Sequence, residues 1–243
     1  ACLYNCIEST GIWPEGLSTG LISMLNKGDG LKAKDLRPIS VTSVLYRIWS
    51  ACRVREVLVW QEEWASEALL GFRHAHGCED VYWQIAFELE SAHATGQGLC
   101  GICIDFAKAF DRVPLHFVLN MAERMGMPSN VLRPLRSIYG AMTRHFKIGT
   151  LVGKAFKATN DILQGCPLSV ALLNVLMQVW CKDVTCLAGV RARFYADDAT
   201  ATGNRPQQIE HVLQLTQEFA QLTGMEVSFK KCESWATQAR ARK

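Results

Sequence analysis

The chain has 243 residues, of which 49% are hydrophobic and 20% are charged, and its formal net charge is +3. This is ordinary globular composition, and the length allows one large domain or two closely packed subdomains. The run "LSVALLNVLMQVW" is broken by Ser169, Asn174 and Gln178, so it does not predict a membrane span and no membrane partner is expected. Because the chain starts at Ala1 and shows no secretory signal, we expect a fragment.

The ten cysteines predict neither disulfides nor a zinc site. The motif "CGIC" has the spacing of metal ligands, but Cys100 and Cys103 fall in a strand-like run, where residues three apart point to opposite faces. Reduced thiols are typical of an intracellular protein, and the sequence does not distinguish nucleus from cytoplasm.

The charge is unevenly distributed along the chain. Residues 223–243 hold five basic and two acidic residues, an excess of three positive charges that equals the net charge of the whole chain. We expect residues 236–243 to form a flexible basic tail, which is either simply solvated or follows nucleic-acid phosphates.

The first part of the chain predicts one strand followed by two helices. Residues 17–30 are typical of a strand that closes in a turn at 28–30. Residues 42–65 predict a long amphipathic helix with an apolar stripe formed by Val44, Ile48, Ala51, Val54 and Leu58. Residues 78–96 then predict a second helix, which ends at Gly96.

The middle of the chain predicts a strand, two helices and a hairpin. The apolar run 99–105 ends in Asp105 and indicates a strand buried on both faces. Helices are expected over 115–126 and, more weakly because of Pro134, over 129–140. Residues 144–149 and 154–160 then predict a hairpin.

The last part of the chain alternates helices with short strands. Residues 167–183 predict a helix that is apolar nearly all round and therefore buried. Strands over 191–195 and 199–202 form a second predicted hairpin, with Asp197 and Asp198 at its tip. A helix over 206–224 and a strand over 225–229 follow. Strands and helices that do not alternate regularly favour an α+β fold.

Three carboxylates end predicted strands: Asp105, Asp197 and Asp198. Two carboxylates about 4 Å apart repel by about 4 kcal/mol at an effective dielectric near 20, and a divalent cation removes that cost. Carboxylate oxygens favour Mg²⁺ or Mn²⁺, and a two-metal site suits phosphoryl transfer. On spacing alone, the sequence favours three unrelated turn carboxylates, because short acidic motifs recur by chance.

Six blocks that occur in a fixed order give the sequence a family resemblance. They are "LRPISVTSVLYRIWS" (36–50), "LLGFRHAHGCEDV" (69–81), "IDFAKAFDRV" (104–113), "LQGCPLS" (163–169), "FYADD" (194–198) and "GMEVSFKK" (224–231). With these blocks, residues 17–235 resemble the reverse transcriptase (RNA-dependent DNA polymerase) domain, most closely that of non-LTR (LINE-type) retrotransposons and group II intron proteins. The last four blocks look like motifs A, B, C and D of that family.

The resemblance implies an α+β right-hand polymerase palm, an antiparallel sheet packed on helices, with a fingers subdomain. It implies fingers and part of the palm over 1–100, the palm with motifs A–D over 101–235, and the basic tail over 236–243. Because the chain ends just past motif D, we expect the thumb and any endonuclease to belong to other segments of a longer parent protein.

The resemblance also implies a role for each matching residue near the carboxylates. Asp105 and Asp197 would hold two Mg²⁺ ions, for which Mn²⁺ can substitute, and Asp198 would support them less directly. Phe110 would lie under the sugar of the incoming nucleotide and exclude a 2′-hydroxyl, unless it is simply a core aromatic. Lys231 would protonate the departing pyrophosphate, with Lys230 as a rival, whereas Asp111 and Arg112 are expected to be structural.

Four further residues match nucleotide-binding positions of the family. Arg37 and Lys27 would contact the triphosphate, Arg37 as a rigid fork and Lys27 as a point charge. Lys27 has the weaker match and reads equally as an exposed turn lysine. Gln164 and Gly165 would flank the nucleotide and template, since a glycine lets the backbone approach closely.

The expected function is RNA-templated DNA synthesis, with an RNA template, a DNA primer and a dNTP as partners. An RNA-templated RNA polymerase is a rival within the same chemistry, which Phe110 disfavours. A catalytically weak or inactive RNA-binding remnant of a retroelement, or a maturase-like RNA-binding module, is a rival outside it.

Overall fold

The computed structural model describes residues 1–26 and 36–238. The contacts between residues divide the chain into two compact units. The first unit comprises residues 1–60 and 114–172, and the second comprises residues 61–113 and 173–243. This division differs from the expected boundary between residues 100 and 101, because a strand of the segment 114–172 pairs with the N-terminal strand of the chain.

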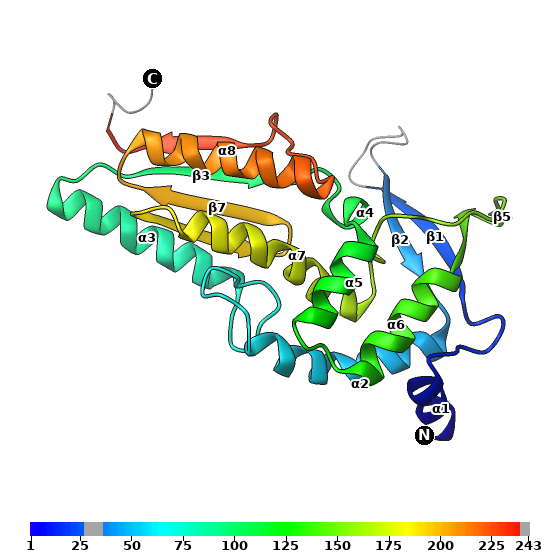
Figure 1. Ribbon diagram of the computed structural model, residues 1–243. Coiled ribbons are helices and arrows are strands. Elements are labelled where there is room, and N and C mark those ends of the chain that lie inside the picture. The colour runs from blue at the N-terminus through cyan, green and yellow to red at the C-terminus, as the bar shows by residue number, and fades with distance from the viewer. Residues whose placement is uncertain (27–35, 239–243) are drawn as a thin grey trace. The chain divides into compact units, whose positions relative to one another are not determined.

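The first unit contains a mixed four-stranded sheet in the order β2-β1-β4-β5. Strand β1 pairs antiparallel with β2 and parallel with β4, and β5 is a short edge strand (Figure 1). The strands are β1 (Thr19–Asn26), β2 (Leu36–Val41), β4 (Thr143–Ile148) and β5 (Leu151–Val152). The helices α1 (Cys2–Thr10), α5 (Leu115–Arg124) and α6 (Ser129–Ala141) lie wholly in this unit.

Helix α2 (Val44–Glu62) buries a different stripe from the predicted one. Val44 and Ile48 are 59% and 47% exposed, whereas Tyr46 and Trp49 are 0% and 1% exposed. The two buried rings pack with Trp13, whose ring lies 5.5 Å from that of Tyr46 and 5.3 Å from that of Trp49. The prediction of this apolar stripe was therefore wrong, because large aromatic rings bury more apolar area than the aliphatic side chains.

The predicted hairpin over 144–160 forms with a different second strand. Strand β4 pairs with Leu151–Val152, and the expected partner 154–160 contributes an isolated bridge between Phe156 and Arg144. Arg144 is 3% exposed and forms a bidentate ion pair with Asp161, whose side chain is 17% exposed. This ion pair fixes the end of the segment that leads into the block "LQGCPLS".

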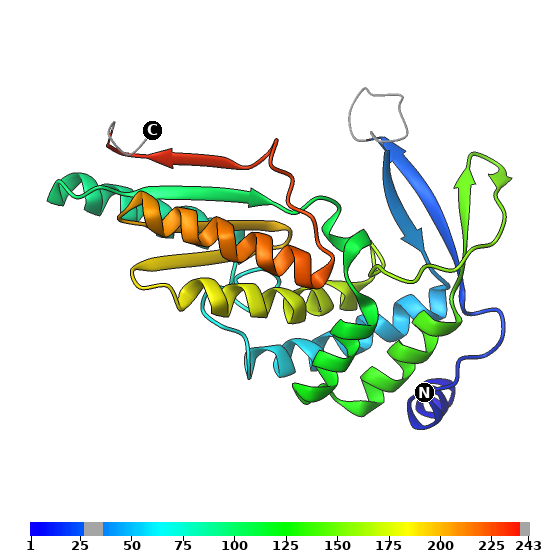
Figure 2. The ribbon, with the colours of Figure 1, turned by 45° about the horizontal axis from the view of Figure 1, so that its top comes forward.

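The second unit contains an antiparallel sheet in the order β6-β7-β3-β8. Its strands are β3 (Cys100–Asp105), β6 (Val190–Tyr195), β7 (Asp198–Gly203) and β8 (Glu233–Ala236), and α8 packs on β3 and β7 (Figure 1 and Figure 2). Its helices are α3 (Cys78–Thr95), α4 (Ala109–Arg112) and α8 (Pro206–Thr223), joined by the C-terminal part of α7 (Pro167–Thr185). None of the helices in the described ranges could cross a membrane.

The helices and the β6–β7 hairpin confirm the predicted elements, but the final predicted strand was wrong. Within 225–229 only Val227 forms a β-bridge, with Phe106, and the fourth strand of the sheet lies further along, at Glu233–Ala236. The short segment pairs antiparallel with residues 105–107 at the end of β3 but does not form a strand of its own.

The sheet of the second unit has one apolar and one polar face. Ile104, Ala199 and Phe194 lie side by side on the apolar face and are at most 1% exposed. The residues adjacent to these three, Asp105, Asp198 and Tyr195, are placed side by side on the opposite face by the register. Cys100 is buried and Cys103 is exposed, so the strand alternation separates the two cysteines as predicted.

Candidate active site

Two of the predicted metal ligands face each other across neighbouring strands. Asp105 is the last residue of β3, Asp198 is the first residue of β7, and the antiparallel register pairs them directly. Tyr195 pairs with Asp198 on the other side, so Asp197 lies in the turn between β6 and β7. Directly opposite residues on one face have Cβ atoms about 5 Å apart, which brings the carboxylates together at the end of the sheet.

The turn that carries Asp197 has an unusual backbone. Only Ala196 and Asp197 separate the paired residues Tyr195 and Asp198, and Ala196 has φ 60. A two-residue hairpin loop commonly needs positive φ at its first position, where glycine, asparagine or aspartate is the usual residue. An alanine held in this left-handed region is a strained conformation of the kind that concentrates at functional sites.

The neighbouring carboxylates perturb one another electrostatically. Burial raises the pKa of Asp198, and the negative charges of Asp197 and Asp105 raise it further. Lys231 acts in the opposite direction and lowers the pKa of Asp198. The three acids therefore form one electrostatic cluster that a nearby cation stabilises.

Lys231 supplies positive charge to this cluster. Its Nζ donates to both carboxylate oxygens of Asp105, at 2.9 Å each. The backbone explains this position, because the Ser228 N–H donates to the Asp105 carbonyl at 2.8 Å and the Lys231 N–H donates to the Ser228 carbonyl at 2.8 Å. The structure therefore places Lys231, rather than its neighbour Lys230, on the catalytic carboxylate predicted from motif A.

The chemistry of the donor set fits a hard divalent cation. Carboxylate oxygens are preferred ligands of Mg²⁺ and Mn²⁺, and the mutual repulsion of Asp105, Asp197 and Asp198 is the kind that a cation relieves. Within residues 1–26 and 36–238, the side chains form no group of three or more His, Cys, Asp or Glu residues that is arranged to hold a metal ion. In this arrangement the cation on Asp105 is the Lys231 ammonium.

Phe110 lies in the short helix α4, five residues after Asp105. Its side chain is half-buried rather than part of the closed core. The turn that leads into α4 passes through Lys108, which has φ 52. Arg112, the last residue of α4, forms an ion pair with Glu226, which agrees with its expected structural role.

The remaining predicted nucleotide-binding residues belong to the first unit. Arg37 is exposed on β2, opposite Leu25 of β1. The carbonyl of Gln164 accepts a hydrogen bond from the Ser40 N–H of the same strand, at 3.0 Å. Gly165 has φ +104, and an added Cβ would lie 3.5 Å from the Ser40 carbonyl oxygen. The structure thus brings the block "LQGCPLS" onto the strand of Arg37, while Lys27 lies outside the described residues.

Buried hydroxyl and thiol groups hold this block in place. The Tyr139 hydroxyl accepts from the Leu163 N–H at 3.1 Å and pairs with the Ser169 hydroxyl at 3.2 Å. The Tyr46 hydroxyl lies 3.1 Å from the Cys166 Sγ. Burial raises the pKa of the Cys166 thiol, which keeps it protonated and unreactive.

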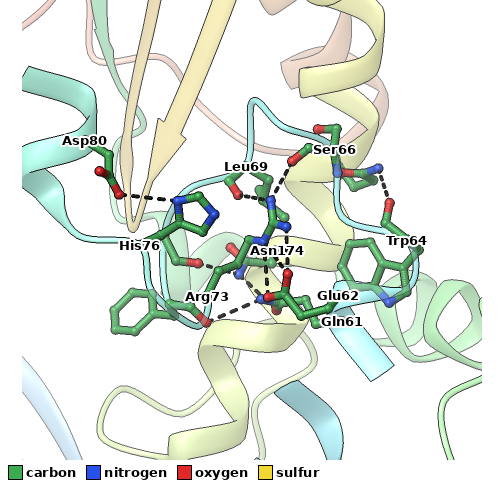
Figure 3. Close-up of polar contacts among 12 residues, drawn as sticks. Gln61, Glu62, Trp64, Ser66, Leu69, Arg73, His76, Asp80 and Asn174 are labelled. Atoms are coloured by element: carbon green, nitrogen blue, oxygen red, sulfur yellow. Dashed lines mark hydrogen bonds and ion pairs between the residues drawn. The ribbon is translucent and has the colours of Figure 1, made fainter. Parts of the chain in front are cut away.

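A polar network beneath the block "LLGFRHAHGCEDV" was not anticipated from the sequence (Figure 3). Arg73 donates to the Glu62 carboxylate and to the carbonyls of Ser66 and Leu69, so its side chain ties together the segment that leads to it. Asn174 of α7 donates to the carbonyl of Gly71 at 2.9 Å. The signal for this network was present in the polar residues that interrupt the apolar run of α7, since a polar side chain inside a buried helix needs a hydrogen-bond partner.

Comparisons with known proteins agree with this geometry. A family profile for reverse transcriptase (RNA-dependent DNA polymerase) matches residues 25–241. The chain is 23% identical over 211 residues to the Pol polyprotein from the type-2 retrotransposable element R2DM of Drosophila melanogaster, covering 83% of this chain and 20% of that protein. It is 21% identical over 242 residues to the Pol polyprotein from the type-1 retrotransposable element R2 of Nasonia vitripennis, covering 96% of this chain and 23% of that protein. The chain therefore spans about a fifth of the length of these curated relatives.

Solved structures support the right-hand polymerase fold. The structure of telomerase from Candida tropicalis in complex with a fragment of telomeric RNA matches with a TM-score of 0.73 and 14% identity, covering 93% of this chain and 42% of that chain. Telomerase from Candida albicans matches with a TM-score of 0.67 and 13% identity, covering 92% of this chain and 44% of that chain. With the profile match over most of its length, the chain belongs to the reverse transcriptase (RNA-dependent DNA polymerase) family, in the form found in non-LTR retrotransposons.

Proposed function

We propose that this chain is the polymerase domain of a retroelement protein and catalyses RNA-templated DNA synthesis by two-metal nucleotidyl transfer. The observation that carries the proposal is the direct register pairing of Asp105 with Asp198, beside Asp197 and under Lys231. Two divalent cations, Mg²⁺ or Mn²⁺, would be held by Asp105 and Asp197 with support from Asp198, and when bound they supply charge that offsets the negative oxygens at the reacting phosphate.

The chain's own residues would position the substrate and move one proton. Lys231 already holds its ammonium protons at the carboxylate cluster, which suits protonation of the departing pyrophosphate. Phe110 would pack under the deoxyribose and exclude a 2′-hydroxyl by its volume. From the first unit, Arg37 would contact the triphosphate as a fork, and the Gln164–Gly165 backbone would flank the nucleotide and the template.

The partners of the proposed reaction are an RNA template, a DNA primer and a dNTP. Base pairing would choose the nucleotide, and the protein would contact mainly phosphates, so binding should weaken with added salt. Because this chain spans only about a fifth of the length of its relatives, the thumb and any endonuclease would be supplied by other segments of a parent protein.

The decisive experiment is primer extension on an RNA template with dNTPs and Mg²⁺, using both this chain and the parent protein that contains it. Asp105→Ala and Asp197→Ala should abolish extension, and the exposed carboxylate variant Asp183→Asn of helix α7 should leave it unchanged. Equal extension by wild type and Asp197→Ala would refute the metal assignment. RNA binding without any extension by wild-type parent protein would instead favour an inactive remnant or a maturase-like module.

A further inference from the structure

The loop 68–72 is attached directly to the strand that leads into the Asp197–Asp198 turn. The Phe194 N–H donates to the Ala68 carbonyl at 2.7 Å, and the Phe194 carbonyl accepts from the N–H groups of Leu70 and Gly71 at 2.8 and 3.1 Å. These bonds continue the sheet by one parallel bridge, between Leu69 and Phe194. The position of the loop and the position of the turn are therefore coupled.

Gly71 makes the closest approach to the turn itself. A Cβ at position 71 would lie 2.5 Å from the Ala196 backbone nitrogen and 3.2 Å from the Tyr195 Cα, so only glycine fits without displacing the turn. The next residue, Phe72, has φ 58, and its ring stacks on that of Tyr195 with centroids 6.2 Å apart. The loop thus supports both residues that precede Asp197.

Two buried amide side chains hold this loop from below. Asn174 Nδ2 donates to the Gly71 carbonyl at 2.9 Å and to Gln61 Oε1 at 3.0 Å, and Gln61 Nε2 donates to the Phe72 carbonyl at 3.3 Å (Figure 3). Asn174 and Gln61 are both 0% exposed. Among the described residues the Asn174 Oδ1 is buried without a hydrogen-bond partner, so Asn174 holds the loop through its Nδ2 alone. A buried amide that loses such a partner costs more than the bond is worth, which disfavours displacement of the loop.

We propose that Asn174 is a positioning residue for catalysis, which sets the Tyr195–Asp198 turn through the backbone of Gly71 and Phe72. The proposal rests on the proposed polymerase function. Asn174 does not touch the carboxylates. It fixes the loop against which the turn is built, so that Asp197 is presented at one position relative to Asp105. Gln61 is the second support, since it both accepts from Asn174 and donates to the loop.

The same helix provides a matched control for a merely structural role. Gln178, one turn further along α7 and 3% exposed, accepts from the Ser66 N–H at 3.1 Å and donates to the Trp64 carbonyl at 2.8 Å. Gln178 thus anchors the segment that precedes the loop 68–72 by the same kind of bond, but neither of these two bonds involves Gly71 or the turn. A variant of Gln178 should weaken folding without changing the turn.

The experiment compares Asn174→Leu, Gln61→Met and Gln178→Met in three measurements. Hydrogen exchange of the peptide 194–198 should become about tenfold faster, or more, in Asn174→Leu and Gln61→Met and stay at the wild-type rate in Gln178→Met. Binding of Mn²⁺ alone, followed by electron paramagnetic resonance, should weaken several-fold in the first two variants only. The kcat for RNA-templated extension, per folded molecule, should fall at least tenfold in the same two variants.

The outcomes separate this proposal from the proposed function. If the wild type neither binds Mn²⁺ nor extends a primer, the polymerase assignment fails, while the exchange rates still test the coupling between Asn174 and the turn. Wild-type exchange in Asn174→Leu, or equal acceleration in Gln178→Met, would overturn the positioning role. Should Asn174→Leu fail to fold, Gln61→Met carries the test, because it removes the contact to Phe72 and leaves the Asn174 amide in place.

Discussion

Lys231 Nζ lies 2.9 Å from each carboxylate oxygen of Asp105, so one ammonium neutralises the residue that motif A contributes to the site. Replacement of Lys231 by Gln should therefore act on both stability and rate. In EDTA we expect the Tm to fall by about 1–2 °C, since the pair is partly exposed and worth no more than about 1 kcal/mol. Added Mg²⁺ should restore most of that loss, because a bound cation neutralises the same carboxylates.

The same variant should lower kcat by about 10²-fold, since Lys231 is the proton donor in the proposed mechanism. Steady-state primer extension measures this, with Lys230→Gln as the control because Lys230 is its exposed neighbour. A larger loss of kcat in Lys230→Gln than in Lys231→Gln would mean that Lys230, and not Lys231, donates the proton.

Phe110 should determine the choice of sugar. In Phe110→Ala, incorporation of rNTPs relative to dNTPs should rise by about 10-fold or more, since removal of the ring opens the space that a 2′-hydroxyl needs and a steric exclusion is worth at least 1–3 kcal/mol. Single-nucleotide incorporation with matched rNTP and dNTP measures the ratio. The exposed aromatic Phe117 provides the control Phe117→Ala, which should leave the ratio unchanged. No gain of rNTP incorporation in Phe110→Ala would count against the assignment.

The buried ion pair of the first unit should dominate its stability. Asp161→Ala leaves Arg144, which is 3% exposed, without its partner, and we expect a loss of about 3–5 kcal/mol in the free energy of unfolding. The exposed pair of Arg136 and Glu123 is the comparison, and Glu123→Ala should cost less than about 1 kcal/mol. Urea denaturation of the two variants measures both values, and similar losses would show that Asp161 is not held in a buried pair.

Glu62 should make a pH-dependent contribution to stability. The hydrogen bond from Arg73 lowers the pKa of Glu62, so the folded pKa lies below the unfolded value. Its stabilisation is therefore fully present above the unfolded pKa of about 4.3 and is lost as the pH falls through the folded pKa. Relative to wild type, Glu62→Gln should lose about 0.5 kcal/mol at pH 7, because the carboxylate is partly screened by solvent.

Thermal unfolding of wild type and Glu62→Gln between pH 7 and pH 3 tests the predicted pH dependence of the Glu62 contribution to stability. The difference in stability should shrink toward zero at the acidic end. A difference that is constant with pH would mean that the amide is disfavoured for reasons other than charge.

Much of the second unit follows from local pattern. The strand that ends in Asp105 and the hairpin around Asp197 are specified by apolar runs, which need no information from distant segments. The local pattern does not predict which two acids lie opposite each other, because the pairing of Asp105 with Asp198 depends on the register between strands that are distant in sequence. The sequence favoured Asp197 as the second ligand, and register places Asp198 directly across the strand pair.

The features that sequence reasoning missed depend on tertiary contacts. Asn174 stands in an apolar helix, where its polarity gives no indication of which carbonyl it will reach. Similarly, the stripe of Val44 and Ile48 has good helical periodicity, yet the rings of Tyr46 and Trp49 take the buried side. Periodicity identifies a helix but does not decide between two apolar faces, because the packing partners come from elsewhere in the chain.

The pairing of β8 with β3 has a practical consequence for defining the smallest usable form of this domain. Trp235 pairs with Gly101, and a Cβ at that glycine would collide with the tryptophan ring. A version shortened to end before Glu233 would turn the strand of Asp105 into an open sheet edge, with free amide groups and a flat surface around Gly101. Such edges recruit other chains, so the shortened domain should precipitate or self-associate although all six sequence blocks upstream are intact. The solubility of the motif A strand is thus set by a short segment that carries no part of the chemistry.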